Sequence, residues 1–157
     1  MTKEQLKYFG AGVLFLLLQI VLFRHLSIYQ MQPDLVLIFL VWFMSKKDRT
    51  AALLMAGLLG FLQDFLLDLW GLHMFTKTLL VYLSHRFIPE DKKTPLLIGP
   101  VFLTVLLTAL VHNIIFLGLN LFIQNYSAEV LFWRHLIGNG LYSAVIACCI
   151  QLFRTKR

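Results

Sequence analysis

Long apolar runs separated by short polar segments dominate the chain. Such runs indicate membrane-spanning helices, because lipid offers the peptide groups no hydrogen-bond partner and a helix satisfies them internally. A transmembrane barrel would need alternating strands of about ten residues, whereas these runs are continuous. The pattern predicts an all-α membrane protein with one domain and six spans, at residues 6–23, 33–44, 50–69, 71–85, 96–123 and 130–153.

The composition supports a membrane rather than an aqueous environment. Of 157 residues, 59% are hydrophobic and 14% are charged, whereas soluble domains are about 45–50% apolar and about 25% charged. The second run is short and covers at most roughly two thirds of a hydrocarbon core about 30 Å thick. We therefore expect it either to borrow flanking residues or to insert only partly.

The positive charges predict the orientation in the membrane. With the N-terminus in the cytoplasm, 11 of the 14 Lys and Arg residues fall on the cytoplasmic side, leaving Arg24, Lys77 and Arg134 on or near the other side. This asymmetry is typical of the positive-inside rule and predicts that both termini are cytoplasmic. The basic residues lie at the ends of apolar runs and form no stripe interleaved with aromatic residues, so the +6 net charge does not indicate nucleic-acid binding.

Charged residues inside the predicted spans are the candidate functional residues, because each is costly in lipid unless it is paired or hydrated. Asp64 and Asp68 share one face of the third span, although Asp68 is near the outer interface and can instead be hydrated there. Lys77 lies in the fourth span, one turn after His73, and is the expected partner of Asp64 or Asp68. A structural ion pair or a partner-docking seam is favoured here over a proton or substrate pathway, and both over catalysis.

Small and polar residues indicate further helix contacts. Gly57 and Gly60 precede Asp64 on nearly the same face, where small side chains let another helix of the bundle or of a partner approach closely. This face and the short second span are expected to leave grooves in which a partner helix could pack. His112 and Asn113 in the fifth span and Asn139 and Ser143 in the sixth are expected to hydrogen-bond across helices.

Local enzyme signatures are missing. The sequence contains no GxSxG, HExxH, P-loop or dinucleotide-binding motif, and His112 has no second metal ligand three or four residues away. We therefore predict no catalytic residue, no cofactor and no metal, although a triad assembled only in space would leave no local pattern.

Several short motifs, in order and spacing, resemble the rod shape-determining protein MreD family of bacteria. They are Pro33-Asp34-Leu35-Val36-Leu37, Gly57-x-x-Gly60-Phe61-x-x-Asp64, Gly71-Leu72-His73, Leu79-Leu80-Val81-Tyr82-Leu83 and Asn139-Gly140-Leu141-Tyr142. The family aspartate is usually followed by a Ser/Gly-rich turn, which residues 65–70 lack. Asp64 keeps the spacing to Gly71, so the family role is carried onto Asp64, with Asp68 as the lesser candidate.

The resemblance implies a six-helix bundle similar to the substrate-binding component of energy-coupling-factor transporters, in the bacterial inner membrane. It also implies a non-enzymatic role in cell elongation. Such a protein binds MreC, a single-span membrane protein, and through it connects the MreB filament to RodA and a class-B penicillin-binding protein. The residues expected in helix packing or partner interaction are Pro33, Asp34, Gly57, Gly60, Asp64, Asp68, Gly71, His73, Lys77, Asn139 and Gly140. The alternatives are a vitamin-binding transporter component and a small intramembrane acyl or phospho transferase.

Overall fold

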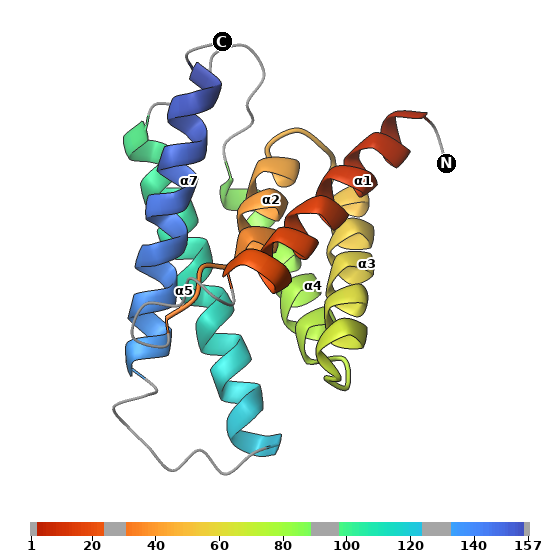
Figure 1. The fold of residues 1–157 in the computed structure, drawn as a ribbon, viewed down its shortest axis with the longest axis vertical. Coiled ribbons are helices and arrows are strands. Elements are labelled where there is room, and N and C mark those ends of the chain that lie inside the picture. The colour runs from red at the N-terminus through yellow and green to blue at the C-terminus, as the bar shows by residue number, and fades with distance from the viewer. Residues whose placement is uncertain (1–2, 24–30, 89–97, 124–132, 156–157) are drawn as a thin grey trace.

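The chain folds into a bundle of helices (Figure 1). This computed structural model describes residues 3–23, 31–88, 98–123 and 133–155, which contain no β-strand. In chain order, the elements are α1 (Lys3–Leu18) with the π-helical turn η1 (Gln19–Phe23), α2 (Leu35–Met44), α3 (Arg49–Leu67), α4 (Leu72–Ser84) with the 3-10 turn η2 (His85–Phe87), α5 (Ile98–Ile123), and the π-helical turn η3 (Arg134–Gly138) leading into α7 (Asn139–Thr155).

The predicted all-helical class is confirmed, and a helix lies at each of the six predicted spans. Four of them are long and apolar enough to cross a bilayer, at Lys3–Leu22, Arg49–Leu67, Ile98–Leu121 and His135–Phe153. The other two are shorter: α2 has 10 residues and α4 has 13. At about 1.5 Å per residue these helices extend only about 15 and 20 Å, so neither crosses a core of about 30 Å by itself.

Helix α2 forms the centre of the bundle. It lies between the α3–α4 pair and the α5–α7 pair, and α1 passes obliquely across it (Figure 1). Nine of its ten residues are buried, and Trp42 is half-buried. A helix that is apolar on every side must be covered on every side, and the surrounding helices explain why so short a segment is stable.

The outer surfaces of the long helices are apolar. Leu14, Leu54, Phe65, Leu107 and Val145 are each more than half exposed. Large exposed apolar side chains on several helices are expected where lipid, rather than water, is the solvent. The chain is therefore an integral membrane protein.

The closest backbone approach is between α3 and α4. A Cβ atom added at Gly60 would lie 2.5 Å from the Cα of Met74 and 2.9 Å from the carbonyl oxygen of His73. Gly57, one turn earlier, has more room, with the Thr78 hydroxyl 3.7 Å from an added Cβ. The small residues therefore serve packing inside the bundle, because α4 occupies this face.

We predict that Gly60→Ala destabilises the protein by about 1–3 kcal/mol, since the added methyl group meets backbone that cannot move aside cheaply. Gly118→Ala in α5 is the matched control, because nothing lies within 4 Å of a Cβ at that position. Thermal unfolding in one detergent would compare them. The control should be neutral or stabilised by up to about 1 kcal/mol, and equal midpoints for the two variants would contradict the close approach.

The six-span topology predicts that the α2–α3 turn and the α3–α4 turn lie on opposite sides of the membrane. Thr50→Cys and Trp70→Cys place a thiol at exposed positions beside these two turns. In a background without Cys148 and Cys149, a membrane-impermeant maleimide added to intact cells should label position 70 and leave position 50 unlabelled. Equal labelling of both from outside would refute the predicted orientation.

Candidate functional site

A salt bridge between Lys77 and Asp34 lies inside the bundle. The Lys77 Nζ atom is 2.6 Å from the Asp34 Oδ2 atom, and the Lys77 side chain is fully buried. Lys77 lies in the second turn of α4, whereas Asp34 immediately precedes α2. The expectation that Lys77 pairs with Asp64 or Asp68 was therefore wrong: the partner comes from a segment 43 residues earlier in the chain.

Asp34 also caps α2. Its Oδ1 atom accepts a hydrogen bond from the Leu37 backbone N–H at 2.9 Å. A carboxylate at a helix N-terminus satisfies a free N–H group and interacts favourably with the helix dipole. One oxygen of Asp34 thus accepts a hydrogen bond from the N-terminus of α2 and the other forms the salt bridge with Lys77, so the carboxylate is stabilised in two ways.

Two side chains from other helices hold the backbone around Asp34. The Asp34 N–H donates to the Ser143 hydroxyl of α7 at 2.9 Å, and the Val36 N–H donates to the Gln19 side-chain oxygen of η1 at 3.0 Å. Ser143 in turn donates to the Asn139 carbonyl at 2.7 Å. The Val36 and Leu37 N–H groups in the first turn of α2 are therefore satisfied by protein, as is needed where water is scarce.

Two histidines flank the ion pair. His112 Nε2 of α5 is 3.8 Å from Asp34 Oδ2, beyond hydrogen-bond range. The His73 ring stacks on Phe116 with centroids 4.8 Å apart, and His112 stacks on the same ring at 6.0 Å. Within the described part of the chain, His112 Nε2 and His73 Nδ1 have no hydrogen-bond partner. The pair is thus enclosed by rings rather than by further charges.

Asp64 has a separate task at the start of α4. Its two carboxylate oxygens accept the backbone N–H groups of His73 and Met74, each at 2.8 Å. Gly71, which precedes α4 with a φ of 80°, has no side chain that could cap it. Asp64 supplies from α3 the cap that the sequence of α4 lacks.

Asp68 lies outside this polar core. It ends α3 in the left-handed conformation, with a φ of 56°, and its side chain is exposed. Of the two positions expected for Asp68, a buried seam and a hydrated site near the outer interface, its exposed side chain agrees with the second, because the chain turns there. The neighbouring Trp70 is fully exposed, as expected for an aromatic residue at a membrane interface.

The other predicted residues lie at helix contacts. Pro33 is buried beside Asp34. The Asn139 side-chain oxygen accepts the Gln32 N–H at 2.9 Å, and Gly140 packs against Leu106 and Leu110 of α5. Asn113 donates from its side chain to the His135 and Leu136 carbonyls of the π-helical turn η3, at 3.3 and 3.0 Å.

Two further polar residues in or beside the polar core were not predicted from the sequence. Gln19 holds the N-terminus of α2, and Gln63 is almost completely buried next to Asp64. The available signal was that each is a polar residue inside an apolar run, and such residues in membrane helices face the bundle interior.

The geometry favours a structural role for the polar core. Asp34 and Lys77 neutralise each other, and Asp64, Ser143 and Asn113 are bonded to backbone groups. No group of three His, Cys, Asp or Glu side chains suited to a metal ion occurs among the described residues. The core connects α2, α4, α5 and α7, which are distant in sequence.

Comparison with protein families identifies the chain. The family model of the rod shape-determining protein MreD matches residues 5–156. The chain belongs to the MreD family. No curated protein sequence and no solved structure matches it, so the likeness to energy-coupling-factor transporter components stays a prediction.

Membership of the MreD family confirms the recognition made from the short motifs and makes the chain a rod shape-determining membrane protein. The family is one of structural, shape-determining proteins and is not a known enzyme family. The polar core described above is thus found in a protein of a structural family.

We predict that Asp34→Asn and Lys77→Met each destabilise this MreD-family protein by about 3–5 kcal/mol, because each leaves one buried charge without its partner. The double variant should be less destabilised than the sum of the two, since it buries no lone charge. Thermal unfolding of all four proteins in one detergent would measure the coupling.

The matched control is the exposed pair of Lys47 and Glu4, whose charged atoms are 3.0 Å apart. Lys47→Met and Glu4→Gln should each cost no more than about 1 kcal/mol, because exposed pairs contribute little. If the buried and the exposed pair responded alike, the salt bridge between Lys77 and Asp34 would not be a main support of the bundle.

Proposed function

We propose that this chain is a non-enzymatic scaffold of the bacterial cell-elongation machinery. It binds an MreC-like single-span protein in the inner membrane and so helps to link the MreB filament to lateral-wall synthesis by RodA and a class-B penicillin-binding protein. The observation that carries the proposal is the match to the MreD family over residues 5–156.

The hydrogen-bond partners of the buried polar groups support a role as a scaffold. The salt bridge joins Lys77 of α4 to Asp34, which also caps α2. Asp64 of α3 accepts two backbone N–H groups at the start of α4. A substrate-binding component would need such groups directed at a ligand. Here they join helices, which gives the bundle a fixed shape that a partner can recognise.

The surface offered to a partner helix differs from the one expected from sequence. The face around Gly57, Gly60 and Asp64 is covered by α4, and α2 is enclosed on nearly all sides. The face around Gly57, Gly60 and Asp64 therefore leaves no groove for another helix, and this part of the hypothesis is corrected. The least covered long helix is α1: 11% of its span is buried, against 28–39% for the other three.

The outer face of α1 has the features of a helix-packing surface. Gly10, Leu14, Leu17 and Val21 recur at helical spacing and are exposed. An added Cβ at Gly10 would meet nothing within 4 Å. Membrane helices associate through close packing at small residues rather than through a hydrophobic drive, so we assign the partner helix to this face.

The scaffold hypothesis predicts that the protein co-purifies in mild detergent with the MreC homologue of the same organism. Gly10→Leu should weaken the complex by tenfold or more, because it fills the position where the partner backbone would approach. Gly118→Leu is the matched control, since that glycine is equally unobstructed but lies on α5.

Depletion of the protein should make rod-shaped cells round, and expression of the Gly118→Leu variant should restore their shape. Loss of uptake of a vitamin with normal cell shape, together with thermal stabilisation of the purified protein by that vitamin, would replace the scaffold with the transporter alternative.

A further inference from the structure

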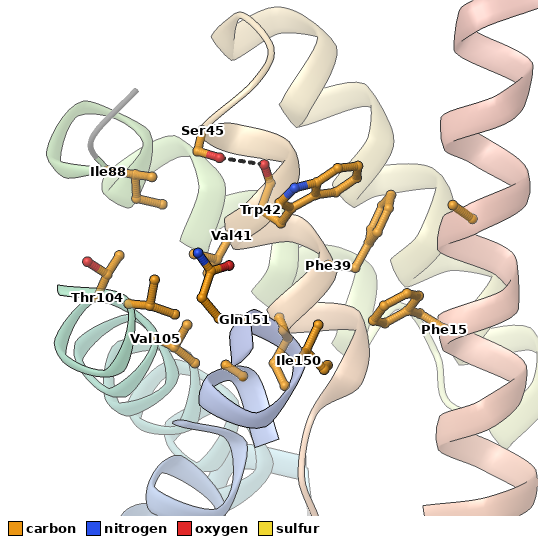
Figure 2. A pocket seen from close by; sticks show the side chains of 14 residues that line it. Phe15, Phe39, Val41, Trp42, Ser45, Ile88, Thr104, Val105, Ile150 and Gln151 are labelled. Atoms are coloured by element: carbon orange, nitrogen blue, oxygen red, sulfur yellow. Dashed lines mark hydrogen bonds between the residues drawn. The ribbon is translucent and has the colours of Figure 1, made fainter. Parts of the chain in front are cut away.

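A pocket of about 280 Å³ lies against the C-terminal half of α2 (Figure 2). It is partly open, and α1, α2, α5 and α7 all contribute to its wall. Its lining residues are Ala11, Phe15, Ile38, Phe39, Val41, Trp42, Ser45, Ile88, Val101, Thr104, Val105, Ala147, Ile150 and Gln151. The Asp34–Lys77 pair is at the other end of α2, so the pocket is separate from the polar core.

The wall of the pocket suits an apolar occupant. Phe15, Phe39 and Trp42 present aromatic rings to it, and most of the other lining residues are aliphatic (Figure 2). The Ser45 hydroxyl at its edge is already engaged, because it donates to the Trp42 carbonyl at 2.7 Å. Thr104 and Gln151 are the other polar lining residues, so a charged ligand would lose its hydration in this pocket with few polar groups to compensate it.

The pocket is bounded by four helices and is partly open rather than enclosed. A lipid acyl chain is narrow and flexible enough to enter along its length.

The pocket lies towards the basic end of the bundle, which we define by Lys3, Lys7, Lys46, Lys47, Arg49 and Arg86. The first turn of α1, the α2–α3 turn, η2 and the last turn of α7 all lie at this end (Figure 1). The lining residues of α5 and α7 lie in the halves of these helices nearest to this end, and those of α2 extend to Ser45 beside it, whereas Ala11 and Phe15 lie in the second half of α1.

Two basic residues lie close in the chain to lining residues of the pocket. Lys46 follows the lining residue Ser45, and Arg86 lies two residues before the lining residue Ile88; both side chains are exposed. The His85 ring lies 3.1 Å from the Lys47 carbonyl and joins the two segments. In the predicted topology, the segments on this side of the membrane carry 11 basic and 4 acidic residues. Such an excess attracts anionic lipid headgroups.

We propose that this pocket is a binding site for an anionic phospholipid of the leaflet at the basic end. One acyl chain lies between α1, α2, α5 and α7, and the phosphate headgroup lies against Lys46 and Arg86. The lipid thereby fills a gap between α1 and the α5–α7 pair.

Native mass spectrometry of the purified, delipidated chain would test the site, with phosphatidylglycerol and phosphatidylcholine of identical acyl chains as probes. We expect one tightly retained phosphatidylglycerol, preferred over phosphatidylcholine by about tenfold or more. Binding should also raise the thermal midpoint. The measurement needs no partner protein, so its outcome is independent of the scaffold hypothesis.

Ala11→Phe should abolish retention of the lipid, because the ring fills the pocket from a half-buried position. The matched control is Val145→Phe on α7, which adds a ring at an exposed site outside the pocket. Lys46→Gln with Arg86→Gln should remove the headgroup preference and leave acyl-chain binding. Lys3→Gln with Lys7→Gln removes the same amount of charge elsewhere at the basic end. This control should change neither the headgroup preference nor the binding of the acyl chain.

Equal retention of the two lipids, or retention that Ala11→Phe does not alter, would overturn the proposal in favour of ordinary annular lipid. Stoichiometric displacement of the lipid by the helix of the MreC homologue, with Ala11→Phe abolishing that complex, would also overturn it by showing a protein helix as the occupant.

Discussion

The buried charge of Lys77 is the constraint on which the rest of the bundle depends. An ammonium group taken out of water costs several kcal/mol unless a well-placed anion compensates it. Asp34 provides that anion at 2.6 Å, and the N-terminus of α2 provides a second favourable interaction for the carboxylate. The pair can form only if α4 lies beside the start of α2, so one electrostatic requirement fixes the relative position of two helices that are distant in sequence.

Two helices of this protein begin inside the bundle, and a carboxylate serves each beginning. Asp34 caps its own helix, α2, whereas Asp64 reaches from α3 to two N–H groups of α4. Helix N-termini within membranes attract anions, and in transporters that anion is often a substrate group. Here carboxylates of the chain itself take that place, which supports our proposal of a scaffold.

The two ends of α2 have different chemistry and, in our proposals, different tasks. At its N-terminus, polar groups from four elements meet and set the architecture. At its C-terminus, apolar side chains leave room for a hydrocarbon chain. The outer face of α1 is assigned to a protein partner, so a lipid in the pocket would support the same helix from its inner side.

The sequence by itself determined the helical class, the membrane environment and the family, because apolar runs, few charges and short ordered motifs are local properties that need no knowledge of packing. It also singled out Asp64 and Lys77, since charges in apolar runs are costly wherever they lie, and Asp34 through the resemblance of its motif to the family. Only the tertiary structure decided their partners. Asp64 and Asp68 were expected to compete for Lys77 because they are near it in the chain, but hydrogen bonds to the start of α4 occupy the first and a left-handed turn directs the second outward. The true partner depends on how α2 is inserted between the other helices, and the pocket arises from four helix faces at once. The Asp34–Lys77 pairing and the pocket produce no hydrophobic periodicity in any single segment, so they can be recognised only in the folded bundle.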